Sequence, residues 1–219
     1  MPPPDAILFD LDGTLVDSER ENVESVVLAV RRLGAEMTEV ERKFVIGHSW
    51  NEIHALITTN HGLAISMPDL IAMAVDEKRA LVEKTGFRAL PGAREAVRRF
   101  AGYAKLAVVS GASCVEVRDA LAGLGLTSFF PVALGAEDYA RGKPNPDPYQ
   151  LAMKLLGVTP PRCLAIEDAT PGILAARAAG VRVIGVRAGN FAGYDLSPAD
   201  VVVDTLDDVT DELCAGLLG

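Results

Sequence analysis

Short apolar runs alternate with longer segments of helical periodicity along most of this 219-residue chain. The apolar runs cover residues 6–9, 105–109, 163–166, 181–186 and 201–203. Runs without polar alternation are typical of parallel strands that are buried on both faces. The helical segments cover residues 92–103, 114–124, 148–156, 171–179 and 207–218. This alternation predicts an α/β fold, Rossmann-like in layout, with a mainly parallel sheet flanked by helices.

One long stretch interrupts the alternation, because residues 17–86 show helical periodicity and no strand pattern. Asp17 and Ser18 can cap a first helix that runs to about residue 33. Further helices are expected over residues 39–45, 49–60 and 67–84. The sequence therefore predicts an all-helical cap domain, residues 17–86, inserted after the first strand. Residues 1–16 and 87–219 are expected to form the α/β core domain.

Composition and charge narrow the function classes. The chain is 49% hydrophobic and 23% charged, which excludes a disordered chain, and its net charge of −9 comes without a basic cluster. Nucleic acid and anionic membranes are therefore not expected as partners. Residues 121–136 are uncharged but too short to cross a membrane, and their Gly and Pro residues predict a helix end, a turn and a strand.

The location is predicted from the start of the chain and from its cysteines. The first residues lack the basic start and apolar stretch of a signal peptide. Cys114, Cys163 and Cys214 are too widely spaced for a zinc site and odd in number, so we expect small buried side chains in a reducing compartment. A cytoplasmic protein is expected, and a monomer is favoured, although the sequence does not determine the oligomeric state.

Polar side chains follow the apolar runs at the points where strands should end. Asp10 and Asp12 follow the first run, Ser110 the second, and Glu167 and Asp168 the third. Ligands of open parallel sheets bind outside the carboxyl ends of the strands. We therefore expect these side chains to meet at one edge of the sheet.

The chemistry at that edge favours a metal ion and a phosphoryl group. Two close carboxylates repel unless a cation lies between them, and oxygen-rich clusters suit Mg²⁺. Ser110, the neighbouring Gly111 and Lys143 offer a hydroxyl, a backbone amide and an ammonium group, which together suit phosphoryl oxygens. Each feature alone is typical of a turn, a helix cap or a solvated loop, and their combination in this order indicates a phosphate site.

The same residues resemble the four motifs of the haloacid dehalogenase (HAD) superfamily. More narrowly, the chain resembles the β-phosphoglucomutase and phosphoglycolate phosphatase-like branch, whose helical cap follows the first motif. The matching segments are residues 10–14 (DLDGT), Ser110, residues 142–149 (GKPNPDPY), and residues 167–168 (ED) with Gly172, Ile173, Ala179 and Gly180.

The resemblance implies a mechanism. Asp10 is expected to attack phosphorus and form an aspartyl-phosphate, and Asp12 to act as general acid and then general base. Ser110, Gly111 and Lys143 are expected to bind the phosphoryl oxygens. The expected Mg²⁺ ligands are the Asp10 carboxylate, the Asp12 backbone carbonyl, Asp168, and Glu167 directly or through the second coordination shell.

Some residues of this chain differ from those of related families, and these differences favour one reaction over others. Asp12 is absent from the dehalogenases, so its presence favours oxygen esters. The β-phosphoglucomutases carry a histidine and an arginine where this chain has Asn22 and Trp50. The prediction is therefore a Mg²⁺-dependent phosphatase that hydrolyses a small phosphomonoester such as a sugar phosphate or phosphoglycolate. The alternatives are a β-phosphoglucomutase-like mutase and a catalytically silent protein that binds phosphate and Mg²⁺.

Substrate choice is expected to lie in the cap, because closing a lid both selects the substrate and excludes water. The candidates are Glu19, Asn22, His48 and Trp50. Trp50 also suits packing between cap helices.

Overall fold

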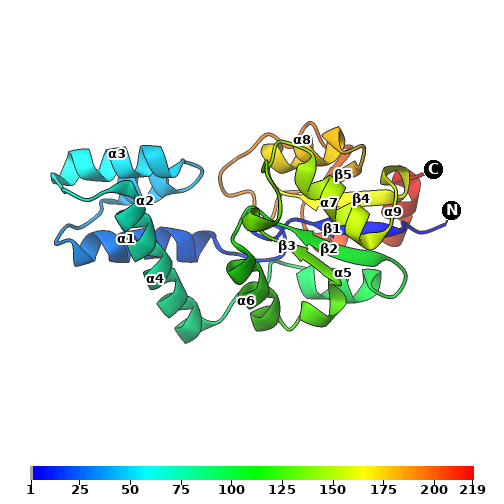
Figure 1. Cartoon of the computed structure of the whole chain (residues 1–219), viewed down its shortest axis with the longest axis horizontal. Helices are drawn as coiled ribbons and strands as arrows, with labels where there is room; N and C mark the ends of the chain where they lie inside the picture. The colour runs from blue at the N-terminus through cyan, green and yellow to red at the C-terminus, as the bar shows by residue number, and fades with distance from the viewer. Residues whose placement is uncertain (1) are drawn as a thin grey trace. The chain divides into compact units, whose positions relative to one another are not determined.

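The computed structural model describes residues 2–219, and within them six strands form one parallel sheet (Figure 1). The strands are β1 (Ala6–Phe9), β2 (Lys105–Val109), β3 (Val132–Leu134), β4 (Cys163–Glu167), β5 (Arg182–Val186) and β6 (Val201–Val203). Their order is β3-β2-β1-β4-β5-β6, so β1 lies between β2 and β4. Phe9 pairs with both Val108 and Ile166, so the carboxyl ends of the three central strands lie level.

Helices cover both faces of this sheet. They are α5 (Ala93–Phe100), α6 (Cys114–Leu124), α7 (Asp147–Leu156), α8 (Thr170–Ala178) and α9 (Asp211–Leu217). Alternate residues of β1 point to opposite faces: Ile7 and Phe9 pack with α5 and α6, and Ala6 and Leu8 pack with α7 and α8. Burial on both faces explains the unbroken apolar runs. The predicted α/β fold with a parallel sheet is confirmed.

Short 3₁₀ helices lie in the connections of this part of the chain. They are η1 (Thr127–Phe129), η2 (Ala136–Asp138), η3 (Pro160–Arg162) and η4 (Leu206–Asp208).

The chain also divides into two compact units. One comprises the start of the chain through Asp17 with Phe87–Asn190 and Tyr194–Gly219, and the other comprises Ser18–Gly86 with Phe191–Gly193.

The second unit holds the helices predicted after the first strand. They are α1 (Glu19–Arg32), α2 (Glu39–Val45), α3 (Trp50–His61) and α4 (Met67–Thr85). The side chains of Thr38, Ser49 and Ser66 cap α2, α3 and α4 by accepting a backbone N–H at the third helical position. The helices enclose a hydrophobic cluster of their own, which includes Ile57 and Leu70. The predicted all-helical insertion is confirmed.

The predicted helix over residues 207–218 is wrong at its start. The chain instead forms η4 and then begins α9 at Asp211. The Asp208 carboxylate accepts hydrogen bonds from the Thr205 N–H at 2.9 Å and the Thr205 hydroxyl at 3.1 Å. Thr210 then caps α9 by accepting the N–H of Leu213. These side chain–backbone bonds compete with helical ones, and hydrophobic periodicity does not detect them.

Two smaller expectations also differ from the structure. Ser18 occupies the N-cap of α1, but its side chain makes no capping hydrogen bond. Cys163 and Cys214 are buried as expected, whereas Cys114, the first residue of α6, is partly exposed. Within residues 2–219, no helix is both long and apolar enough to span a membrane.

Candidate active site

Asp10 is the first residue after β1, at the carboxyl edge of the sheet. Its N–H donates to the Ile166 carbonyl at 3.0 Å, which continues the pairing of β1 with β4 beyond the strand. The chain then turns sharply, with Gly13 at φ +83°. A Cβ on Gly13 would lie 2.1 Å from an Asp168 carboxylate oxygen, so both the turn and the close approach require glycine.

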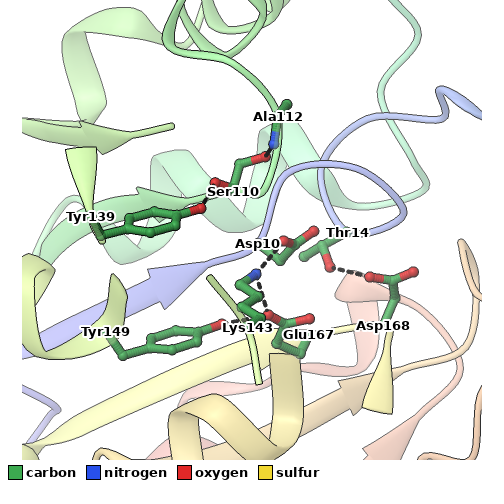
Figure 2. A network of polar contacts seen from close by, with 9 residues as sticks. All are labelled: Asp10, Thr14, Ser110, Ala112, Tyr139, Lys143, Tyr149, Glu167 and Asp168. Atoms are coloured by element: carbon green, nitrogen blue, oxygen red, sulfur yellow. Dashed lines mark hydrogen bonds and ion pairs between the residues drawn. The ribbon is translucent and has the colours of Figure 1, made fainter. Parts of the chain in front are cut away.

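Three buried carboxylates meet at this edge. Asp10, Glu167 and Asp168 each offer an oxygen, and these oxygens lie within 4.8 Å of one another. Glu167 ends β4 and is 1% exposed. Thr14 donates a long hydrogen bond of 3.4 Å to Asp168 (Figure 2). The fold therefore gathers carboxylates from two neighbouring strand ends, as the sequence predicts.

Lys143 joins this cluster. Figure 2 shows its ammonium group between two carboxylates, with Nζ donating to Asp10 Oδ1 at 2.5 Å and to Glu167 Oε1 at 2.6 Å. Burial by itself would lower the pKa of Lys143, but the charges of Asp10 and Glu167 outweigh it and hold that pKa well above its usual value. The group is therefore a permanent cation beside Asp10.

One ammonium does not balance three carboxylates. Burial, together with the neighbouring carboxylates, raises the pKa of both Asp10 and Asp168 above the usual range. A further cation would relieve this repulsion, and an all-oxygen donor set is the kind that hard divalent ions such as Mg²⁺ prefer. The residues therefore fit a divalent metal.

Asp12 is the expected acid and base. It lies two residues after Asp10, is partly exposed, and forms an isolated bridge with Val16. Among the described residues, the cluster of carboxylates that could hold a metal consists of Asp10, Glu167 and Asp168, and the Asp12 side chain is not part of it. Its expected metal contact is through the backbone carbonyl, and that contact stays a prediction.

The predicted phosphate-binding residues lie at the end of β2, the neighbour of β1. The Ser110 N–H donates to the Leu134 carbonyl at 3.0 Å, and the Ser110 hydroxyl accepts the N–H of Ala112 at 3.0 Å. A Cβ added to Gly111 would meet no atom within 4 Å, so the backbone there faces open space. This placement suits anion binding by the Gly111 amide, which stays a prediction.

Two tyrosines belong to the site and were not predicted. The Tyr149 hydroxyl donates to Glu167 Oε1 at 2.5 Å, and the Tyr139 hydroxyl donates to the Ser110 carbonyl at 2.6 Å (Figure 2). Tyr149 ends the matching segment 142–149 and lies in the helix predicted over residues 148–156, where a buried tyrosine needs a hydrogen-bond partner for its hydroxyl. No comparable signal marks Tyr139.

The four cap candidates lie in the helical unit. Glu19 begins α1, and Asn22 follows in its first turn. The His48 ring stacks on Phe44 with 3.7 Å between ring centroids. Trp50 begins α3 and packs against the hydrophobic cluster of the unit, as its structural alternative predicts. A role for any of them in substrate choice stays a prediction.

Comparisons with known proteins agree with the geometry. The family described as haloacid dehalogenase-like hydrolase matches residues 7–186. Hexitol phosphatase A of Escherichia coli (strain K12) is 36% identical over 93% of this chain and 92% of its own length. Validoxylamine A 7'-phosphate phosphatase of Streptomyces hygroscopicus subsp. limoneus is 31% identical over 92% of this chain and 94% of its own. A HAD family hydrolase from Deinococcus radiodurans R1, solved with bound phosphate and sodium, superposes with a TM-score of 0.76 at 28% identity, covering 100% of this chain and 99% of that one.

Proposed function

Because the chain belongs to the haloacid dehalogenase-like hydrolase family and is a phosphoric monoester hydrolase, we propose that it is a Mg²⁺-dependent phosphatase that works through an aspartyl-phosphate on Asp10. The contact that carries the proposal is the 2.5 Å hydrogen bond from Lys143 Nζ to Asp10 Oδ1. It holds a cation where negative charge accumulates when a carboxylate attacks a phosphoryl group.

The chain's own residues account for both half-reactions. The Asp10 carboxylate forms a bond to phosphorus while the bond from phosphorus to the ester oxygen breaks. Asp12 donates a proton to the departing oxygen, so that the alcohol leaves neutral. Asp12 then accepts a proton from the water that cleaves the aspartyl-phosphate, which releases inorganic phosphate and restores both carboxyl groups.

The other residues bind and orient the phosphoryl group. Lys143 is proposed to contact one phosphoryl oxygen, and the Ser110 hydroxyl and Gly111 amide the others. A bound Mg²⁺ would orient the phosphoryl group and neutralise charge between it and Asp10. The proposed ligands are Asp10, the Asp12 carbonyl and Asp168, with Glu167 directly or through a water.

The substrate is proposed to be a small phosphorylated metabolite of the sugar phosphate type. Two of the most similar relatives are named as phosphatases of a hexitol and of validoxylamine A 7'-phosphate. Both names describe a phosphate on a polyhydroxylated compound, which favours a hydroxyl-rich substrate here as well. Selection among such substrates is assigned to Glu19, Asn22, His48 and Trp50. A cytoplasmic location and a monomeric state stay predictions.

The test is phosphate release from a panel of phosphomonoesters, with and without Mg²⁺. The panel contains hexitol phosphates, hexose phosphates, phosphoglycolate and nucleotides. Asp10→Asn removes the nucleophile, and Asp119→Asn, an exposed residue of α6 paired with Arg118, is the matched control. We expect Mg²⁺-dependent release that Asp119→Asn retains and Asp10→Asn loses. Acid quenching with a ³²P-labelled substrate should trap label on the protein only when Asp10 is present.

Other outcomes would point to the alternatives. Conversion of a hexose 1-phosphate to its 6-phosphate without phosphate release would indicate the mutase. Mg²⁺ and phosphate binding without turnover of any panel member would indicate the catalytically silent protein. Equal phosphate release by Asp10→Asn and the wild type would refute the aspartyl-phosphate route.

A further inference from the structure

Lys143 lies in a short segment that is tied to two different strand ends. We call residues 139–149 the lysine segment. At its start, the Tyr139 hydroxyl donates at 2.6 Å to the carbonyl of Ser110, which follows β2. At its end, in α7, the Tyr149 hydroxyl donates at 2.5 Å to Glu167, the last residue of β4.

The sheet order gives these two bonds a common consequence. β1 lies between β2 and β4, and Asp10 follows β1. A segment tied to the ends of β2 and β4 therefore passes over the end of β1. Lys143 lies between the two tyrosines in sequence, and its Nζ meets Asp10 Oδ1 at 2.5 Å. The two hydroxyls thus set the place from which the lysine side chain reaches Asp10.

Tyr149 contacts both members of the ion pair beneath the site. Its side chain is fully buried, and the Glu167 oxygen that accepts its hydroxyl also accepts Lys143 Nζ at 2.6 Å. Lys143 Nζ lies 5.5 Å from the centre of the Tyr149 ring. On another side, Gly172 is so close that a Cβ there would lie 2.0 Å from Glu167 Oε1. The Glu167 carboxylate is therefore fixed in orientation.

This fixed carboxylate determines what the ammonium group can do. An ammonium has three N–H donors, and two of them go to Asp10 and Glu167. The third can donate to a phosphoryl oxygen. Without the Tyr149 hydroxyl, a buried carboxylate oxygen loses one of two donors, and the ammonium moves toward Glu167 to compensate. That movement lengthens the contact with Asp10.

We propose that the hydroxyls of Tyr139 and Tyr149 are positioning groups that hold the Lys143 ammonium beside Asp10, where it can bind a phosphoryl oxygen. The proposal rests on the proposed function, which assigns Lys143 to the phosphoryl group. Tyr149 has the larger effect, because its acceptor is a buried carboxylate, whereas the acceptor of Tyr139 is a neutral carbonyl.

The test compares three Tyr→Phe variants, each of which keeps the ring and removes one hydroxyl. Tyr149→Phe and Tyr139→Phe probe the lysine segment. Tyr103→Phe is the matched control, because its hydroxyl donates to Asp211 at 2.9 Å and it precedes β2, at the opposite end of that strand from Ser110. For each variant we measure kcat, KM, Tm, and the affinity for inorganic phosphate in the presence of Mg²⁺ by calorimetry.

We expect Tyr149→Phe to lower kcat at least about tenfold, because it loses a hydrogen bond to a charged acceptor. Tyr139→Phe should lower kcat about threefold, because it loses a hydrogen bond to a neutral acceptor. KM should change less than kcat, the fall in kcat should exceed what the change in Tm accounts for, and phosphate should bind more weakly in the same order. Wild-type kcat and phosphate affinity in both variants would overturn the proposal. Losses that match the change in Tm and recur in Tyr103→Phe would also overturn it, because they indicate a structural role.

The phosphate titration separates this proposal from the proposed function. If the wild type binds phosphate but turns over no substrate, the proposed function fails, and weaker binding in the tyrosine variants still supports the positioning role. If the wild type neither binds phosphate nor releases it from any substrate, both proposals fail. If the wild type turns over substrate and both tyrosine variants keep its kcat, the positioning role alone fails.

Discussion

Replacing Glu41 by glutamine should destabilise the helical unit, because Glu41 is a buried carboxylate held by several donors. It is 4% exposed. One of its oxygens, Oε2, accepts the Thr38 N–H at 2.7 Å and the Thr38 hydroxyl at 2.9 Å, and Oε1 accepts Asn60 Nδ2 at 2.8 Å. His61 Nε2 lies 3.1 Å from Oε1. Glutamine replaces one oxygen by a donor, so at least one existing donor loses its acceptor.

The magnitude follows from the pKa of Glu41. Burial by itself would raise this pKa, but hydrogen bonds from Asn60 and Thr38 outweigh it and lower the pKa from 4.5 to about 2. A shift of that size corresponds to about 3 kcal/mol of folding free energy. Because the folded-state pKa is the lower one, this stabilisation is fully present above the unfolded value of 4.5 and is lost as the pH falls toward 2.

The assay is urea unfolding of the wild type and Glu41→Gln from pH 7 to pH 3, with amide hydrogen exchange reporting on α2 and α3. The free energy of unfolding of Glu41→Gln should be about 2–3 kcal/mol lower than that of the wild type at pH 7. By linkage, about 2 kcal/mol of this difference should be gone at pH 3. Glu52→Gln is the matched control, because Glu52 forms the same capping box with Ser49 at the start of α3 but is exposed. Its loss should be smaller. Equal losses in the two variants, or a Glu41→Gln loss that does not change with pH, would refute the argument.

Four further predictions concern the site itself. Mg²⁺ at one hundred times its Kd should raise Tm by roughly 5–10 °C, and Asp168→Asn should abolish the rise. Burial raises the pKa of Asp10 and Asp168, so the metal-free protein loses stability as the pH rises. The increase in Tm that Mg²⁺ causes should therefore grow between about pH 5 and pH 8. An increase that is the same at every pH would contradict this reading. Gly172→Ala would place a Cβ 2.0 Å from Glu167 Oε1 and should lower kcat at least about 100-fold, with an unchanged circular dichroism spectrum. The control is Gly216→Ala, whose added Cβ would meet no atom within 4 Å and which should behave as wild type. Gly189→Ala would place a Cβ 2.0 Å from the Gly13 carbonyl oxygen and displace the turn after β1; kcat should fall, and normal activity would show that the turn tolerates the shift.

The parallel sheet was predictable because each strand is buried on both faces. β1 illustrates this, since all four residues of Ala6–Phe9 are buried and no polar residue interrupts them. The start of α9 was not predictable from the same periodicity. There the Asp208 carboxylate accepts both the backbone N–H and the hydroxyl of Thr205, and the hydrophobic pattern of residues 207–218 continues through the break.

The site shows a similar division between topology and local contacts. The three carboxylates could be placed from the sequence because each stands at or just after a strand end, and the rule for parallel sheets brings strand ends together. The tyrosines could not, because Tyr149 is 18 residues from Glu167 and Tyr139 is 29 residues from Ser110. Their pairing depends on how α7 and the preceding loop pack against the sheet, and no spacing rule encodes it.

This difference has a consequence for reading rates from sequence. Tyr149→Phe keeps the hydrophobic pattern of α7 and every strand-end residue, so the fold and the catalytic residues predicted for the variant are the same as for the wild type. The change removes a donor from the carboxylate that orients Lys143, and the proposed effect appears in kcat and in the affinity for phosphate. Two chains with the same proposed catalytic residues can therefore differ in rate through side chains that hydrophobic patterning assigns to the core. The hydrogen-bond partner of each buried hydroxyl, which only the folded structure provides, decides which of those side chains matter.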